Sequence, residues 1–168
     1  NIIENIKGDI IFDNVYFAYQ ESKEVLHGIN FAASSGSVTA LVGSSGSGKS
    51  TIASLAASFL NPSSGKITID GKDLSKVNLN SYRQNLGVVL QDDFLFEGTI
   101  RENILFPRPG ATEEELDAAV HGAYVNEFSD RFDDGLDTLI GERGVKLSGG
   151  QKQRISIARA LLAKPKII

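Results

Sequence analysis

The stretch GSSGSGKS, residues 43–50, decides the fold of this chain. It fits the pattern G-x-x-x-x-G-K-[ST], whose backbone N–H groups surround bound phosphates. Residues 38–42, VTALV, lead into it as a short, mostly apolar segment that favours a strand. Residues 51–60 follow with apolar side chains at the i, i+3, i+4, i+7 spacing of one helix face. The sequence therefore predicts a phosphate-binding loop between a strand and a helix N-terminus, where an anion is favoured.

The composition of this loop suits the chemistry of bound phosphate. Its glycines let the backbone curl so that successive N–H groups point at an anion. Lys49 can reach the terminal phosphates, and the Ser50 hydroxyl can ligate magnesium. A Gly/Ser-rich surface turn that matches by chance is the alternative, and the flanking strand and helix argue against it. The expected nucleotide-binding residues of this loop are Gly43, Ser44, Ser45, Gly46, Ser47, Gly48, Lys49, Ser50 and Thr51.

A second helix N-terminus, with two glycines, follows about a hundred residues later. Residues 147–151 read LSGGQ, and residues 152–162 carry apolar residues on one face together with strong helix formers. Ser148 is placed to cap this helix, and the paired glycines allow close backbone approach to a ligand. Read alone, the pattern is explained equally well by an ordinary cap. Read together with the phosphate loop, it predicts a second phosphate contact through Ser148, Gly149, Gly150 and Gln151.

The two motifs resemble those of the ATP-binding-cassette (ABC) ATPases. LSGGQ is the signature of that family, and residues 43–51 are similar to its Walker A loop. The resemblance covers nearly all of the chain and places Tyr19 at the aromatic residue that stacks on adenine. It places Gln91 at the glutamine of the Q-loop, which acts on magnesium and the attacking water. Residues 138–144, TLIGERG, and 96–104, FEGTIRENI, resemble the exporter subclass.

This resemblance implies a fold and a domain organisation. The expected fold class is α/β, a P-loop NTPase fold of the ABC ATPase type, with a mixed sheet core, N-terminal antiparallel strands and a helical signature subdomain. Residues 1–93 would form the ATP-binding core with the Walker A loop and the Q-loop. Residues 94–160 would form the helical subdomain with the signature, and residues 161–168 would begin the Walker B strand.

The resemblance also implies an activity, cofactors and partners. ATP and Mg²⁺ are the expected cofactors, with Lys49 and Gln91 in catalysis and with Ser50 and Gln91 as magnesium ligands. Two cassettes would form a head-to-tail dimer in which each signature covers the ATP on the other cassette. The transmembrane domains of an exporter would convert ATP hydrolysis by this dimer into transport, which places the cassette at the cytoplasmic face of a membrane.

Several functional positions of the family follow the signature in sequence. They are the Walker B aspartate, the catalytic glutamate, the D-loop and the switch histidine. His27 and His121 both precede the signature, so neither is expected to be the switch histidine. We expect these positions to lie beyond Ile168 in a larger polypeptide, and the 168 residues alone to lack ATPase activity.

Local patterns predict further elements. Residues 112–115, TEEE, have the S/T-x-x-E form of a capping box, and an apolar helix face follows them. Asp92 and Asp93 follow Gln91 directly, but two adjacent carboxylates in a loop are usually solvated and are not expected to bind metal. The segments expected to form strands, besides 38–42, are 10–17, 29–33, 66–70 and 87–91.

Composition argues against other classes of function. The 17 Lys and Arg residues against 21 Asp and Glu residues give a net charge of −4, which does not support nucleic-acid binding through a basic surface. The chain has no cysteine, which excludes disulfides and thiolate metal sites. No apolar run approaches the ~20 residues needed to cross a bilayer, so membrane association would come from a partner domain.

Two alternatives to an exporter remain open. A soluble ABC ATPase of DNA repair or translation would have no membrane domain, and the exporter-like segments argue against it. A nucleotide-binding module without catalysis is the second alternative, and an ATPase assay beside a binding titration separates it from an enzyme. A GTPase is disfavoured because the N-K-x-D motif that reads guanine does not occur.

Overall fold

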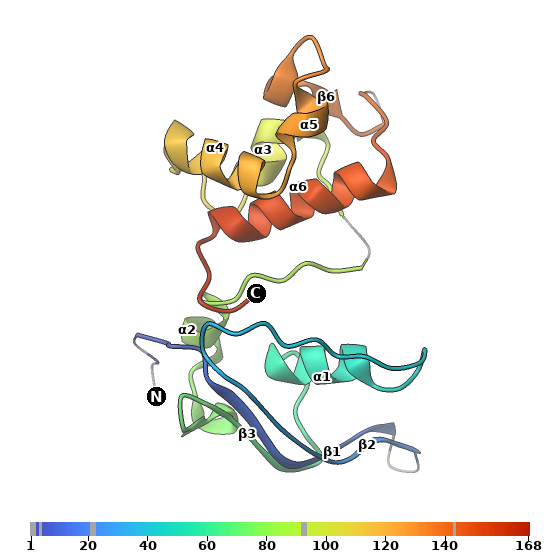
Figure 1. Ribbon diagram of the computed structural model, residues 1–168, viewed down its shortest axis with the longest axis vertical. Helices are drawn as coiled ribbons and strands as arrows, with labels where there is room; N and C mark the ends of the chain where they lie inside the picture. The colour runs from blue at the N-terminus through green and yellow to red at the C-terminus, as the bar shows by residue number, and fades with distance from the viewer. Residues whose placement is uncertain (1–2, 4, 21–22, 92–93, 143) are drawn as a thin grey trace. The chain divides into compact units, whose positions relative to one another are not determined.

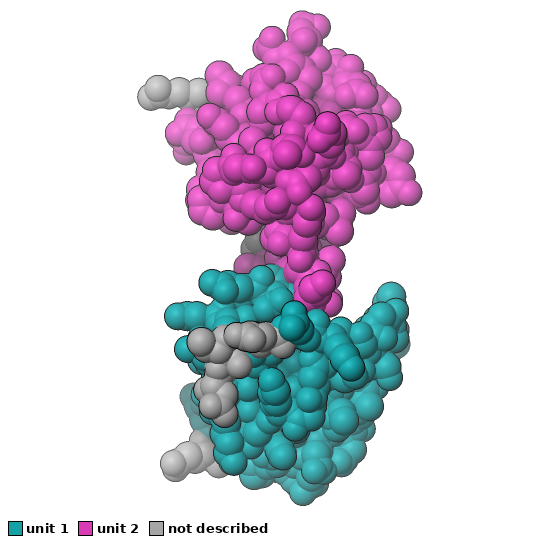
Figure 2. All heavy atoms as spheres, turned by 90° about the vertical axis from the view of Figure 1, so that its left-hand side faces the viewer, with its two compact units in different colours: residues 1–86, 167 teal, residues 87–166, 168 magenta. Residues whose placement is uncertain are grey.

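The computed structural model describes residues 3, 5–20, 23–91, 94–142 and 144–168 of the chain. The chain forms two units, which Figure 2 shows in different colours. The first unit comprises residues 1–86 with Ile167, and the second comprises residues 87–166 with Ile168. Each unit has its own cluster of buried apolar side chains.

The first unit is built around an antiparallel sheet in the strand order β2-β1-β3-β4, of which Figure 1 labels β1, β2 and β3. β1 (Ile10–Gln20) and β2 (Lys23–Ala33) form a long hairpin, and β3 (Ser64–Ile69) pairs with the other edge of β1. β4 (Lys72–Asp73) is a short edge strand, and the 3₁₀ helix η1 (Leu74–Lys76) follows it. The predicted strands that form are those at 10–17, 29–33 and 66–70, and β1 and β2 extend beyond their predicted bounds.

A bulge in β1 decides which of its side chains enter the core. Ile10 and Phe12 are buried, as are Val15 and Phe17, so the alternation of buried positions shifts between Phe12 and Val15. The pairing with β2 shifts register at the same place, and Asn14 has a positive φ of 48°. Because side chains alternate between the faces of a strand, an extra residue is needed to bring both apolar pairs to one face.

Helix α1 (Lys49–Ala56) joins the core of the first unit through Leu55, which has no exposed surface. The sequence predicted a helix that reaches past Phe59, but α1 ends at Ala56 and half of Phe59 is exposed. Ser58 adopts a left-handed φ of 56°, and a right-handed helix cannot continue through that conformation. The predicted helix is therefore right in its place and wrong in its length.

Side chains of α2 (Leu79–Arg83) fix the end of α1. The Tyr82 hydroxyl donates to the Ala56 carbonyl oxygen at 2.7 Å, and the Arg83 guanidinium donates to the Ser58 carbonyl oxygen at 2.8 Å. Carbonyl groups at a helix end have no partner within the helix, so these bonds replace missing ones. Tyr82 is fully buried, and burial raises its pKa to about 12, so it remains a donor at neutral pH.

Asp70 ties the N-terminal segment to the turn after β3. Its carboxylate accepts hydrogen bonds from the backbone N–H groups of Lys7, Gly8 and Asp9, at 2.8, 3.1 and 2.9 Å. Partial burial raises the pKa of this carboxyl, but the N–H donors and the charge of Lys7 outweigh burial and hold the pKa below its usual value. The Asp70 carboxylate is thus the hydrogen-bond acceptor for three consecutive backbone N–H groups.

The second unit is mainly helical. Its core lies between α3 (Ile100–Leu105), α4 (Glu113–Gly122) and α6 (Gly149–Leu162). The helices of this unit follow apolar patterns that are local in the sequence. The unit also contains one antiparallel strand pair, formed by β5 and β6. The remaining elements of the unit are α5 (Asn126–Ser129), η2 (Gly135–Asp137), β5 (Gly98–Thr99) and β6 (Leu139–Ile140).

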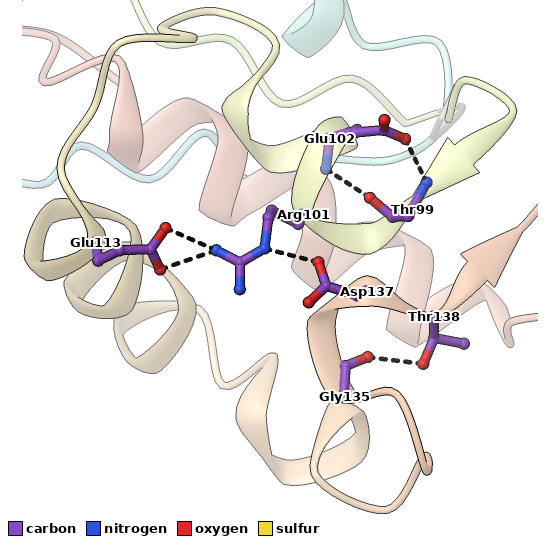
Figure 3. Close-up of polar contacts among 7 residues, drawn as sticks. All are labelled: Thr99, Arg101, Glu102, Glu113, Gly135, Asp137 and Thr138. Atoms are coloured by element: carbon purple, nitrogen blue, oxygen red, sulfur yellow. Dashed lines mark hydrogen bonds and ion pairs between the residues drawn. The ribbon is translucent and has the colours of Figure 1, made fainter.

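Side-chain caps set the starts of these helices. Thr112 and Glu115 form the predicted capping box at α4. Thr99 and Glu102 form the same arrangement at α3, which Figure 3 shows. The apolar face predicted behind residue 115 is buried and consists of Leu116, Ala119, Val120 and Ala123.

Arg101 joins three elements of the second unit (Figure 3). Its Nη1 donates to both carboxylate oxygens of Glu113, at 2.9 and 2.8 Å, and its Nε donates to Asp137 at 2.8 Å. α3, the start of α4 and η2 are therefore held together by one guanidinium.

Two predicted strands do not form. Residues 38–42 and 87–91 lack a strand partner among the described residues. Val38 and Val42 are 98% and 93% exposed, although their side chains suit a buried strand. A strand needs hydrogen bonds to a neighbour, and a local preference for extended backbone does not supply that neighbour. Parallel pairing in the described part of the chain is limited to two isolated bridges, Leu86–Ile167 and Ile140–Val145.

Candidate functional site

The glycine-rich loop at 43–48 turns sharply just before α1. The Ser47 N–H donates to the Ser44 carbonyl oxygen at 3.2 Å, which closes the turn. Gly48 then adopts a left-handed φ of 92°, and a Cβ at this position would lie 2.7 Å from Cδ2 of Leu26. A larger residue at Gly48 would be strained as well as crowded. The conformation of the loop therefore depends on glycine, as the sequence motif requires.

The N-terminus of α1 has no side-chain cap among the described residues. Gly48 is its N-cap residue, and no acidic residue lies in its first turn. The first N–H groups of a helix have no partner within the helix and carry partial positive charge. Ser50 is exposed in this first turn, whereas Thr51 is buried. The arrangement can accept an anion, because free donors and a hydroxyl lie together at one helix end.

Lys49 holds its ammonium group over the backbone of the loop. Its Nζ donates to the carbonyl oxygens of Gly43 and Ser44, at 2.9 and 2.7 Å. The Ser47 hydroxyl lies 3.4 Å from the same nitrogen. The carbonyl groups thus hold a full positive charge over the loop that precedes α1. A phosphate bound to the loop would meet that charge.

Tyr19 lies near the end of β1 and contacts the helix that follows the loop. Its hydroxyl lies 3.1 Å from Oγ1 of Thr51, within hydrogen-bond distance. The Tyr19 ring is T-shaped to the Phe17 ring at a centroid distance of 4.8 Å, and the residue as a whole is 63% exposed. The structure therefore brings Tyr19 to the phosphate loop, 32 residues away in sequence. No pattern in the sequence indicates the contact between Tyr19 and Thr51.

The signature residues form a self-contained helix start at α6. The Ser148 hydroxyl accepts from the Gln151 N–H at 3.2 Å, and the Ser148 N–H donates to Oε1 of Gln151 at 2.8 Å. The predicted cap at Ser148 is thus present. Gly149 and Gly150 are exposed, and a Cβ on either would meet no described atom within 4 Å. Their backbone is open to close approach by another molecule.

Gln91 belongs to the second unit and is exposed. Asp92 and Asp93, which follow it, lie outside the described residues. Within the described part of the chain, no group of three or more His, Cys, Asp or Glu side chains could hold a metal ion. Mg²⁺ bound with a nucleotide usually takes one or two protein ligands besides phosphates and waters. The hydroxyl and amide oxygens of Ser50 and Gln91 have the chemistry that such a magnesium ion requires.

Sequence reasoning also missed an arginine that contacts both Phe94 and Asn103. Arg159 on α6 donates to the Phe94 carbonyl oxygen at 3.0 Å and to the carbonyl and side-chain oxygens of Asn103, at 2.9 and 3.0 Å. Its guanidinium also lies 5.4 Å from the centroid of the Phe96 ring. An arginine beside the buried positions of an amphipathic helix was the signal available in the sequence.

Residues 26–168 match the sequence profile of the family described as ABC transporter. The chain belongs to the ABC transporter family. The fold is that of an ABC ATPase domain, a member of the P-loop NTPase class, as a solved ABC exporter structure also indicates. The fold class expected from the sequence is therefore confirmed.

Relatives of this ABC chain include named exporters. It is 50% identical over 159 residues to the ATM1-type heavy metal exporter of Novosphingobium aromaticivorans, which covers 95% of the chain and 26% of the exporter. It is 46% identical over 165 residues to the ATP-dependent lipid A-core flippase of Legionella pneumophila, which covers 98% of the chain and 28% of the flippase. These similarities confirm the resemblance to exporter-type ABC proteins.

A solved structure agrees with these ABC relatives. It is described as a bacterial Atm1-family ABC exporter with ATP bound, and it matches with a TM-score of 0.87 and 49% identity over 95% of the chain. The chain covers 28% of that protein, and so spans less than a third of each of these relatives. No helix in the described part of the chain has the length and apolar composition that crossing a bilayer requires.

Proposed function

We propose that the chain is the ATP-binding cassette of an exporter-type ABC transporter. It would bind Mg-ATP and couple ATP hydrolysis in a head-to-tail dimer to export across a membrane. The observation that carries this proposal is the start of α1, which no described side chain caps, together with Lys49, which the carbonyl oxygens of Gly43 and Ser44 hold over the preceding loop. The printed functions of two relatives, a heavy metal exporter and a lipid A-core flippase, support the exporter assignment.

The nucleotide in this proposal lies across the first unit. The adenine stacks on the exposed Tyr19 ring, because an aromatic face binds any base by stacking. The triphosphate accepts from the N–H groups of the loop and of the first turn of α1, and Lys49 neutralises its terminal charge.

Catalysis in this proposal is positioning and charge neutralisation. Magnesium, when bound, neutralises phosphate charge and orients the γ-phosphate for displacement. The Ser50 hydroxyl and the Gln91 side chain are the groups of this chain that would hold it. Gln91 also orients the attacking water through its amide.

A second nucleotide-binding domain is the proposed partner of the signature. The start of α6 already pairs its own cap groups, yet Gly149 and Gly150 leave backbone exposed beside them. Exposed N–H groups at a helix start attract a phosphate. Ser148 and both glycines would therefore cover the γ-phosphate of ATP that is held by the loop of the other cassette.

An exposed aromatic cluster in the second unit supports a membrane-domain partner. It consists of Phe94, Phe96 and Phe106, which are 70%, 37% and 59% exposed. The Phe96 ring lies 5.2 Å from the Phe94 ring and 4.4 Å from the Phe106 ring, between centroids. Large apolar side chains that gather on a surface mark sites of protein interaction. We assign this cluster to contact with a transmembrane domain at the cytoplasmic face of the membrane.

Binding and turnover, measured together, test the proposed function. The full-length protein that contains these 168 residues is purified and titrated with Mg-ATP by calorimetry, and phosphate release is followed in the same preparation. We expect saturable ATP binding that ADP displaces, and phosphate release that depends on magnesium. Absence of saturable ATP binding would overturn the proposal. ATP binding without phosphate release would identify a nucleotide-binding module and overturn the catalytic part.

A further inference from the structure

The hydroxyl groups of Tyr19 and Thr51 link the end of β1 to the first turn of α1, at an oxygen–oxygen distance of 3.1 Å. We propose that Thr51 is a positioning residue, which holds the Tyr19 ring ready for the base through this hydrogen bond. The proposal rests on the proposed function, since it takes ATP as the ligand. It makes recognition of the base depend on a residue of the phosphate-binding helix.

The Tyr19 ring needs an anchor, because most of its side chain faces solvent. At 63% exposure, packing alone restricts it little, and an exposed side chain loses rotamer freedom when a ligand binds. Phe17 supports the ring through a T-shaped contact. The hydrogen bond to Thr51 fixes the far end of the ring. Together these contacts restrict the ring before the base arrives and leave much of its surface open.

Thr51 is suited to be the fixed end of this bond. It is 4% exposed and lies in α1, so its position is set by the helix and by the packing around it. A buried hydroxyl is unfavourable without a hydrogen-bond partner, and the structure gives the Thr51 hydroxyl the phenol of Tyr19 as its partner. The bond therefore gives the buried Thr51 hydroxyl a partner, and it restricts the rotamers of both side chains.

The consequence is a coupling between two parts of the nucleotide site. Lys49 and Ser50 directly precede Thr51 in the helix that would receive the phosphates. A change at Thr51 should therefore weaken stacking on Tyr19, although Thr51 need not touch the base. Inorganic tripolyphosphate has no base, so its binding should not depend on the Tyr19 hydroxyl.

A double-mutant cycle on the purified protein tests this coupling. Tyr19→Phe keeps the ring, Thr51→Val keeps the shape of the side chain, and each removes one hydroxyl. Mg-ATP and magnesium tripolyphosphate are titrated into the parent, both single variants and the double variant. We expect each single variant to bind ATP about threefold to tenfold more weakly, the loss expected for one hydrogen bond. The double variant should bind no more weakly than the weaker single variant.

Two further measurements separate positioning from damage to the fold. Thr51→Ser keeps the hydroxyl and should lose much less ATP affinity than Thr51→Val. Tyr19→Phe should bind tripolyphosphate as the parent does, whereas general damage to the loop would weaken both ligands. Should Thr51→Val fail to fold, Tyr19→Phe decides the matter through its ATP and tripolyphosphate affinities.

Additive losses in the double variant, or an ATP affinity of Tyr19→Phe equal to that of the parent, would overturn the inference and leave the proposed function intact. Equal weakening of ATP and tripolyphosphate by Tyr19→Phe would overturn it as well, because the hydroxyl would then act on the loop and not on the base. A parent protein that binds tripolyphosphate but not ATP, or neither, would overturn the proposed function together with the inference.

Discussion

The helix starts of α1 and α6 lie in motifs that contain glycine and serine, GSSGSGKS and LSGGQ, but they differ in how side chains cap their backbone N–H groups. At α1 the N-cap residue is Gly48, and no described side chain caps the first turn. At α6 the N-cap residue is Ser148, whose hydroxyl and N–H are both paired with Gln151. Among the described residues, no side chain therefore accepts from the first-turn N–H groups of α1, whereas at α6 the Ser148 side chain already accepts from the N–H of Gln151.

This difference separates two kinds of phosphate site. A site with unpaired donors and a lysine beside them binds an anion on its own. A site whose cap is already formed offers exposed backbone and adds contacts to a ligand that is held elsewhere. The comparison therefore favours the loop of residues 43–50 as the primary ATP site and the signature as a surface that closes on it.

The largest effect is expected from Gly149→Asp. The fold should tolerate this change, because a Cβ at Gly149 meets no described atom within 4 Å. A carboxylate beside the γ-phosphate of the opposing cassette would repel it, and like charges at an interface are strongly unfavourable. ATP-driven association of two cassettes, measured by size-exclusion chromatography, should be lost. ATP binding to the separate cassettes should persist.

Gly110→Asp is the matched control for this variant. Gly110 lies in a loop of the same unit, and a Cβ there also meets no described atom within 4 Å. It adds the same charge away from the signature, so association should resemble that of the parent. If Gly149→Asp instead abolished ATP binding to the separate cassette, the signature would contact ATP in its own chain.

The next largest effect is expected from Lys49→Ala. A charge-assisted hydrogen bond contributes about 1.5–3 kcal/mol, so ATP affinity should fall by about tenfold to a hundredfold. Calorimetric titration measures this loss, and the circular dichroism spectrum should not change. Lys72→Ala, at an exposed position of β4, removes the same charge from the same unit and should bind ATP as the parent does. Equal ATP affinity in Lys49→Ala and the parent would contradict the role assigned to Lys49.

Much of the candidate site could be predicted, because its signals are local. The loop at 43–50 and the caps at Thr112 and Ser148 are each set by residues a few positions apart, and the structure contains both caps. The sheet pairing of residues 38–42 depends on a neighbouring strand far away in sequence. The local preference of these residues for extended backbone does not reveal whether such a neighbour exists. No described segment pairs with them.

Contacts between distant residues account for the rest of what sequence did not reveal. The hydrogen bond between Tyr19 and Thr51 spans 32 residues, and the bond from Arg159 to Asn103 spans 56. Neither leaves a periodic pattern. The bulge at Asn14 is local, but its effect on which side chains are buried depends on pairing with β2. The family and fold class were therefore easier to predict than the packing of the candidate site.

A smaller effect is expected from Ser148→Ala, which removes the cap of α6. Loss of an N-cap side chain costs about 0.5–2 kcal/mol of stability. Urea denaturation of the purified protein should show that loss, while Ser148→Thr, which keeps the hydroxyl, should lose little. ATP binding by the loop of residues 43–50 should not change, since Ser148 belongs to the other unit. A fall in ATP affinity of the separate cassette would show that the two helix starts are not independent.

The smallest effect is expected from Asp70→Asn, which tests a carboxylate of the protein that binds backbone N–H groups. The Asp70 carboxylate pairs with the N–H groups of Lys7, Gly8 and Asp9, as a ligand phosphate would pair with those of the loop. Replacing the charged acceptor by a neutral amide should cost about 0.5–1.5 kcal/mol of stability near neutral pH. Asp13→Asn, an exposed change on β1, is the control.

Acid should remove the difference between the parent and Asp70→Asn. The pKa of Asp70 in the folded protein lies below its ordinary value of 3.8, so the folded state prefers the charged form more than the unfolded state does. The stabilisation by Asp70 is therefore fully present above about pH 3.8 and is lost as the pH falls through the folded-state pKa. Urea midpoints of the two proteins should differ at neutral pH and converge in acid. A difference that persisted unchanged well below pH 3.8 would mean that the shape of the side chain, and not its charge, holds the N-terminal segment.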